Sequence, residues 1–183
     1  MLHHIVKRRL KAFSRDEGGM ISVEALILAP ILCWAFVAVY TYFDAYRQSA
    51  LNLKASYTIS DLVSRETQTV TAAYTASMVD LFRKMTDSTN NAALRISVIR
   101  FDDDTDKYLI DWSSNHGFDN PLSNSDMEGM RARLPIMPDE ERLILVESRS
   151  TYVPPFYAGI DIMDIDNFVF TRPRFAGQIA SDI

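Results

Sequence analysis

The sequence of 183 residues predicts an α+β protein in which one long N-terminal helix packs on a small antiparallel sheet. Residues 20–43 form a nearly continuous apolar segment, and no proline interrupts residues 31–65. Apolar residues recur at every second position from Leu94 to Val98, which is typical of a half-buried strand. Residues 142–153 form another strand-like segment, which two prolines end. Together these observations predict a helix that is transmembrane first, then amphipathic, and that packs on a small antiparallel sheet.

Residues 1–19 form a leader in which basic residues outnumber acidic ones, although the whole chain carries a net charge of −5. A basic flank before an apolar span is retained in the cytoplasm. The sequence therefore predicts a cytoplasmic N-terminus and a domain of residues 44–183 on the other side of the membrane. Because that domain is acidic, we expect no nucleic-acid binding.

Residues 20–43 are long enough to span a membrane, because about 20 apolar residues cross the hydrocarbon core as a helix. A secretory signal peptide has a shorter apolar core that ends in a small-x-small cleavage site. Residues 20–43 form a longer apolar run and have no convincing site of that type at their end. A buried core helix of a soluble protein is the other alternative, but this segment is apolar on all sides. Cys33, the only cysteine, lies within the span, so an intramolecular disulfide is excluded.

The periodicity predicts the remaining elements in order. The amphipathic continuation of the first helix should end near Arg65, and polar residues separate it from a second helix. Two strands joined by an acidic turn, a short helix and two further strands should follow. The expected helices are residues 72–86 and 126–134. The expected strands are residues 94–101, 108–113, 142–153 and 167–171. Residues 114–125 are expected to form a loop, and residues 160–165 a loop or an edge segment.

Candidate sites for catalysis or metal binding are sparse in the sequence. The acidic run Asp102–Asp106 resembles half a calcium loop, but Lys107 and Ser113 occupy the positions that need glycine and a carboxylate. We expect a solvated turn there, with an irregular calcium site as the alternative, and the same for the aspartates at 161, 164 and 166. His116 is expected to be a polar loop residue. With no nucleophile elbow and no Gly-rich phosphate loop, the sequence predicts no enzyme, no cofactor and no metal.

Glu24 is the one charged residue between Met20 and Phe43. An ionisable group a few residues into a membrane helix costs about 3 kcal/mol unless it has a partner, which makes it a candidate functional residue. Alternatively, Glu24 lies at headgroup depth, where the helix N-terminus favours a carboxylate.

Gly19, Met20 and Glu24 together resemble a type IV prepilin processing site, in which cleavage follows a glycine and glutamate is fifth in the mature chain. The segment from Val23 to Pro30, Val-Glu-Ala-Leu-Ile-Leu-Ala-Pro, is similar to the signature of the TadE/TadG-like family, the pseudopilins of tight-adherence (Flp) pilus systems. Ala25-Leu26 replaces the Phe-Ala of that signature, and methionine is first in the mature chain. Phe170-Thr171-Arg172-Pro173-Arg174-Phe175 resembles the Arg-Pro-Arg ending of the family.

The resemblance implies a minor pilin-like assembly protein of the bacterial inner membrane, with a periplasmic domain and with adhesion as its context. A prepilin peptidase would remove residues 1–19, and the freed amine of Met20 would pair with Glu24 of a neighbouring pilin-like subunit. Pro30 would bend or loosen the helix for packing in a filament. The implied partners are the peptidase, other pilin-like subunits and the assembly machinery. The alternative is an unprocessed, single-pass periplasmic binding domain, and a hydrolase is a third interpretation.

Overall fold

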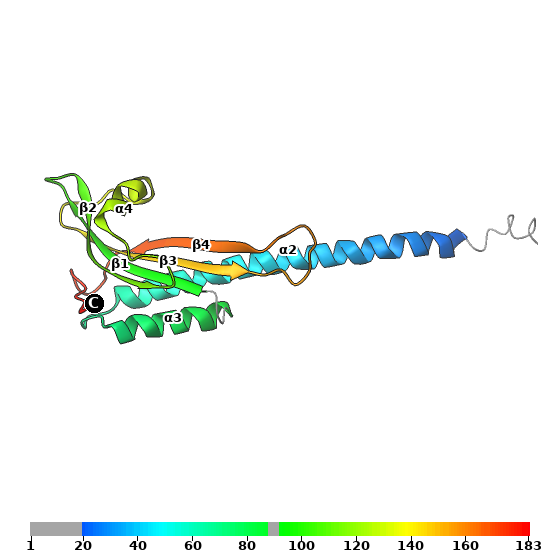
Figure 1. Cartoon of the computed structure of the whole chain (residues 1–183), viewed down its shortest axis with the longest axis horizontal. Coiled ribbons are helices and arrows are strands. Elements are labelled where there is room, and N and C mark those ends of the chain that lie inside the picture. The colour runs from blue at the N-terminus through cyan, green and yellow to red at the C-terminus, as the bar shows by residue number, and fades with distance from the viewer. Residues whose placement is uncertain (1–19, 88–91) are drawn as a thin grey trace, which may run out of the picture. The chain divides into compact units, whose positions relative to one another are not determined.

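The computed structural model describes residues 20–87 and 92–183, and it has the α+β fold that the sequence predicts (Figure 1). The leader of residues 1–19 lies outside the described residues. The elements, in order, are α2 (Met20–Ser64), α3 (Ala72–Thr86), β1 (Ala92–Asp102), β2 (Lys107–His116), α4 (Asn124–Met130), the 3-10 helix η2 (Arg131–Arg133), β3 (Arg142–Tyr152) and β4 (Met163–Thr171). The first helix ends one residue before the predicted Arg65, and α3 has the predicted bounds.

The chain divides into two compact units. The first contains the helix up to Phe43 and the segment Pro155–Ile160, and the second contains residues 44–154 and 161–183. The second unit holds the whole sheet. Whether Phe43 also marks a membrane boundary stays a prediction.

The sheet has the strand order β2-β1-β3-β4, and every neighbouring pair is antiparallel. The prediction that residues 114–116 form a loop was wrong, because β2 continues to His116, which pairs with Leu94. The register of β1 and β2 shifts between Val98 and Ile99, so β2 bulges there and still follows β1 to its end. A polar run of Ser-Ser-Asn-His reads as a loop by propensity, but pairing with a buried central strand overrides propensity.

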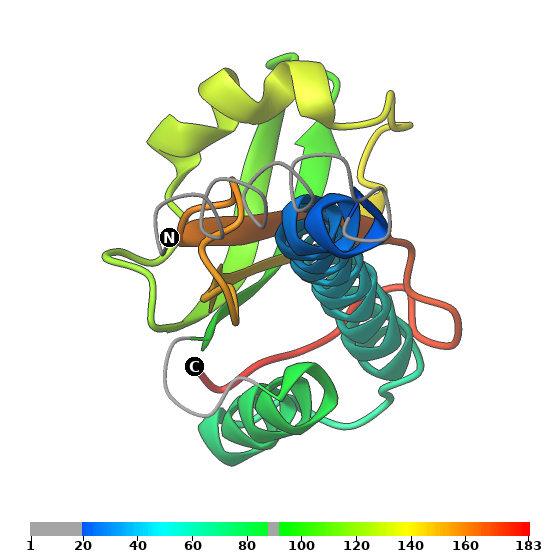
Figure 2. The same ribbon diagram turned by 90° about the vertical axis from the view of Figure 1, so that its right-hand side faces the viewer.

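One face of the sheet is covered by α3 and by the second half of α2, which lie on the same side of the strands (Figure 2). Ile59 and Val63 of α2 and Phe82 of α3 meet Leu94 and Ile144 of the sheet in one apolar cluster, and all five are almost fully buried. This cluster is the main core of the domain. It also explains the amphipathic pattern of α2 beyond Phe43, because the apolar stripe of this part of the helix packs on the sheet.

A buried polar seam runs beside this core, where α2 meets β3. The Ser56 hydroxyl lies 2.7 Å from the Ser148 hydroxyl, and the Ser150 hydroxyl donates to Asn52 Oδ1 at 2.6 Å. All four side chains are at least 99 % buried. Their small size lets the helix approach the sheet closely, and their mutual hydrogen bonds offset the cost of burying them.

The other face of the sheet is covered at one end by α4 and η2. Met127 and Leu134 pack there on Ile99, Leu143 and Leu145 in a second buried cluster. At the N-terminus of α4, the Asp126 carboxylate accepts hydrogen bonds from the Ser123 hydroxyl at 2.6 Å and from the Ser123 amide at 2.9 Å. The loop that precedes α4 is thereby tied to the first turn of the helix.

Because the two hydrogen bonds from Ser123 favour the ionised form of Asp126, we expect the start of α4 to be less stable in acid. The Ser123 hydroxyl, and after it the Ser123 amide, lower the pKa of Asp126. A carboxylate with a lowered pKa stabilises the fold above its unfolded pKa, and this contribution is lost as pH falls through the folded value. Ser123→Ala should raise the pKa of Asp126 towards its ordinary value, as measured by the NMR titration of its side-chain carboxyl carbon. Ser125→Ala is the control, and an equal pKa rise there would contradict the assignment to Ser123.

The final strand begins earlier than the sequence predicts. Residues 160–165 were expected as a loop or edge segment, and β4 starts at Met163 as an edge strand paired with β3. Two cross-strand contacts hold this extension: Arg149 Nε donates to Asp166 at 2.7 Å, and the Thr151 hydroxyl donates to Asp164 at 2.7 Å. Alternating acidic residues are common on exposed edge strands, where they discourage pairing with another chain.

The chain after β4 packs back onto the domain. The amide of Arg174 donates to the Ser64 carbonyl at 2.8 Å, and the Arg174 guanidinium lies 3.0 Å from Asp61. Further on, Ile179 is 2 % exposed, and its carbonyl accepts a hydrogen bond from the Trp112 indole at 2.8 Å. The Arg-Pro-Arg segment therefore ties the tail to the end of α2.

Candidate functional site

The first half of α2 exposes large apolar side chains, and all residues from Val23 to Trp34 are exposed. Leu26 is 75 % exposed, Trp34 64 % and Phe36 72 %. In the described part of the chain, α2 is the one helix long and apolar enough to cross a membrane, and none of its most apolar stretch is buried. Apolar surface of this extent needs cover, which a bilayer or neighbouring helices provide. A signal sequence near the N-terminus meets the same criteria of length and composition.

Glu24 is exposed near the start of this segment. Within the described residues it has no hydrogen bond and no ion pair, and its neighbours Val23 and Ile27 are 58 % and 59 % exposed apolar side chains. A carboxylate in this setting is costly in lipid unless a cation reaches it. Any such cation has to come from outside the described chain.

Pro30 lies inside α2, and the helix continues through it. Because proline has no amide hydrogen, the carbonyl of Leu26 loses its helical hydrogen-bond donor. Pro30 follows Glu24 by six positions, which is about 9 Å along the axis and about 120° around it. The two predicted assembly residues therefore lie on different faces of the helix and would contact different neighbours.

The predicted cleavage site is only partly described. Gly19 lies outside the described residues, and Met20 is the first residue of α2 as described. The structure thus places Glu24 and Pro30 on one helix, and the assignment of Gly19 and Met20 to a cleavage site stays a prediction.

The acidic turn between β1 and β2 has structural roles in the described chain. Asp102 accepts from the Thr105 amide at 3.3 Å, and Asp106 forms an ion pair with Arg131. Among the described residues, no group of three or more His, Cys, Asp or Glu side chains is arranged to hold a metal ion. A groove of about 640 Å³ lies between this turn and α4, and Tyr108, Met127 and Arg131 are among its lining residues.

His116 is half-buried at the end of β2, which corrects the prediction of a polar loop residue. Its Nε2 lies 3.2 Å from the Thr75 hydroxyl and 3.4 Å from the Ser114 hydroxyl. Within the described residues no carboxylate is bonded to this ring, so the arrangement lacks the third member of a Ser-His-Asp triad. The histidine instead links the end of β2 to α3.

One feature of the apolar unit has no counterpart in the sequence-based prediction. The segment Pro155–Ile160, which connects β3 to β4, belongs with the apolar half of α2 rather than with the sheet. Phe156 meets Tyr40 edge-on, with ring centroids 6.3 Å apart. A loop that carries two aromatic residues and no charge was the available signal.

No protein-family model matches the chain, and neither a curated protein nor a solved structure matches it. Its function has to be argued from its own residues.

Proposed function

We propose that this protein is a pilin-like (pseudopilin) subunit for the assembly of a tight-adherence (Flp) type IV pilus. In this proposal a prepilin peptidase cuts the bond between Gly19 and Met20, and the mature protein stays anchored by residues 20–43. The domain of residues 44–183 then faces the periplasm, where it contacts other pilin-like subunits. No catalytic role falls to this chain.

The observation that carries the proposal is the carboxylate of Glu24, which lies on an apolar, exposed stretch of helix and has no partner within the described residues. This exposed position supports pairing with a cation from another molecule. The amine of Met20 in a neighbouring subunit is such a cation once the leader is removed. An ion pair between subunits would neutralise two charges in an apolar setting and would fix how far one helix is shifted against the next.

The exposed apolar half of α2 also supports this proposal. From Val23 to Trp34 its side chains are exposed on every face, as expected for a helix that is surrounded first by lipid and then by other helices. The alternative, an unprocessed signal-anchored binding domain, has the same helix but gives Glu24 no partner. Processing of the leader therefore separates the two functions.

Co-expression with a prepilin peptidase should shorten the protein by residues 1–19, as measured by intact mass and N-terminal sequencing. Gly19→Val should block this cleavage, because cleavage at a prepilin processing site follows a glycine. Gly18→Val is the matched control and should still be processed. A mature protein that keeps its leader would favour the unprocessed binding domain, and a new N-terminus at Gly19 would move Glu24 to the sixth position and contradict the proposed pairing.

A further inference from the structure

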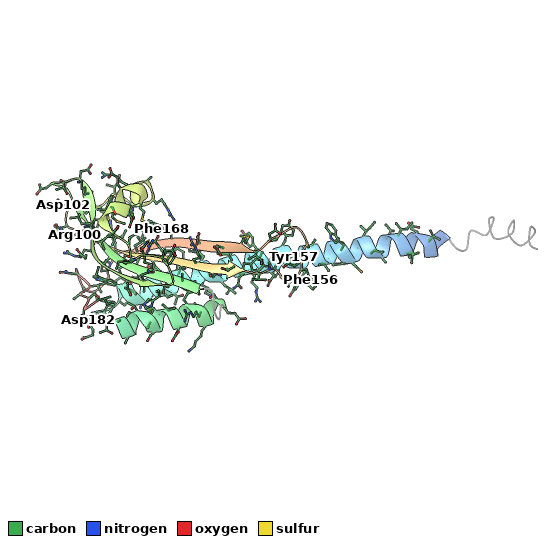
Figure 3. The ribbon with its side chains drawn as sticks, viewed as in Figure 1. Arg100, Asp102, Phe156, Tyr157, Phe168 and Asp182 are labelled. Atoms are coloured by element: carbon green, nitrogen blue, oxygen red, sulfur yellow. The ribbon has the colours of Figure 1, made fainter. Side chains whose placement is uncertain are left out.

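The segment Pro155–Ile160 is an uncharged loop with exposed aromatic rings. Phe156 is 49 % exposed and Tyr157 is 79 % exposed. Both residues belong to the same compact unit as the apolar half of α2, and they lie beside that helix (Figure 3). Exposed aromatic residues in an uncharged loop are unusual on a surface that faces water only.

The loop is seated on the helix at two points. Phe156 packs edge-on against Tyr40, and Gly159 approaches Tyr42. A Cβ atom at Gly159 would lie 3.2 Å from the Tyr42 hydroxyl, and its φ of 98° is one that residues with side chains rarely adopt. Glycine is therefore the residue that allows this close approach. The contact holds the loop next to Tyr40 and Tyr42.

The position of this contact along α2 indicates where the loop would lie relative to a bilayer. Tyr40 follows Val23 by 17 residues, which is about 26 Å of helix, close to the ~30 Å thickness of the hydrocarbon core. If the apolar half of α2 spans the bilayer, Tyr40 and Tyr42 lie at its outer boundary. Tyrosine is enriched there because its ring is apolar and its hydroxyl is polar.

We propose that the loop Pro155–Ile160 inserts into the membrane–water interface beside α2, on the side of the bilayer that faces the domain of residues 44–183. The loop thereby contacts the lipid directly. The proposal rests on the membrane anchor of the proposed function. Lipid is the occupant that the residues favour, because the loop continues the apolar surface of the anchor and carries no charge that could pair with a protein partner. The exposed ring of Tyr157, with its polar hydroxyl, suits the headgroup depth.

The test uses the full chain in phosphatidylcholine vesicles, with an environment-sensitive NBD label on a single cysteine. Cys33→Ser removes the only native cysteine. Tyr157→Cys then places the label on the loop, Phe36→Cys places it on the anchor, and Thr105→Cys places it on the exposed β1–β2 turn. Lipids carrying a nitroxide near the headgroup quench labels at that depth.

The expected result is blue-shifted emission and strong quenching at position 157, and neither change at position 105. Adding Phe156→Asp should reduce the quenching at 157, because a carboxylate is poorly tolerated at that depth. If position 36 is shielded in the vesicles while position 157 behaves like position 105, the anchor stands and the loop proposal is overturned. If both positions behave like 105, the anchor fails as well. A blue shift at position 157 that grows with protein concentration, without quenching by the nitroxide lipid, would mean that the loop contacts a second copy of the chain. That result would also overturn the proposal.

Discussion

Replacing Phe82 with alanine is expected to destabilise the domain by about 3–5 kcal/mol, the usual cost of truncating a fully buried phenylalanine. Phe82 is 0 % exposed and belongs to the apolar cluster that joins α3 and α2 to the sheet. Its loss leaves a cavity at the point where the two helices and the sheet meet. A change of this size is a large fraction of the stability of a typical domain.

The measurement is urea denaturation of the full chain in detergent, with Trp34→Phe in every variant so that the tryptophan fluorescence reports on Trp112, which lies in the same cluster. Lys84→Ala, on the exposed side of α3, is the matched control and should change the free energy of unfolding little. An unfolding free energy for Phe82→Ala within about 1 kcal/mol of the native value would mean that the cluster closes around the gap or that α3 contributes little to the core.

Replacing Glu24 with alanine is expected to leave membrane insertion intact and to impair assembly. Removing the carboxylate makes the helix more apolar, so insertion should not suffer. If the lost ion pair contributes about 2 kcal/mol to each contact between subunits, association falls about 30-fold. The readouts are the membrane-bound fraction and the fraction of protein recovered in sheared pili or cross-linked to pilin-like partners.

Three variants make this result specific. Glu24→Gln keeps the shape of the side chain without its charge and should behave like Glu24→Ala, whereas Glu24→Asp should retain part of the assembly. Leu28→Ala removes an exposed apolar side chain one turn further along the helix and is the matched control. Normal assembly of Glu24→Ala would mean that the carboxylate is only a cap at headgroup depth, and it would remove the main support for the proposed pairing.

Most of the fold could be predicted from the sequence because its signals are local. The apolar segment, the absence of proline after Pro30 and the period of the apolar residues predicted α2 and α3 closely, since each pattern depends on neighbouring residues. Strand ends were less accurate. Ser114–His116 is polar and Met163–Asp166 alternates apolar with acidic residues next to a turn. The strand conformation of both depends on partners in β1 and β3 that lie far away in the sequence.

The candidate site divides in the same way. Glu24 and Pro30 are visible in the sequence because charge and proline are rare in an apolar helix. The contact of Phe156 with Tyr40 joins residues more than a hundred positions apart, so no local pattern reveals it. The cleavage at Gly19 depends on another protein and stays a prediction.

The packing of the tail onto the domain has a consequence for the order of folding. The Val70 amide donates a hydrogen bond to the Ala180 carbonyl at 2.8 Å, and the Val70 carbonyl accepts one from the Asp182 amide at 3.2 Å. The Trp112 indole donates its hydrogen bond to the Ile179 carbonyl. These contacts join parts of the chain that are synthesised far apart, and such contacts slow folding because a long loop has to close first. A chain whose residues 179–182 have not yet been synthesised would form its helices early but would leave the indole unbonded and the core open. The last step of folding is therefore set by the delivery of residues 179–182, not by the helix that leads the chain.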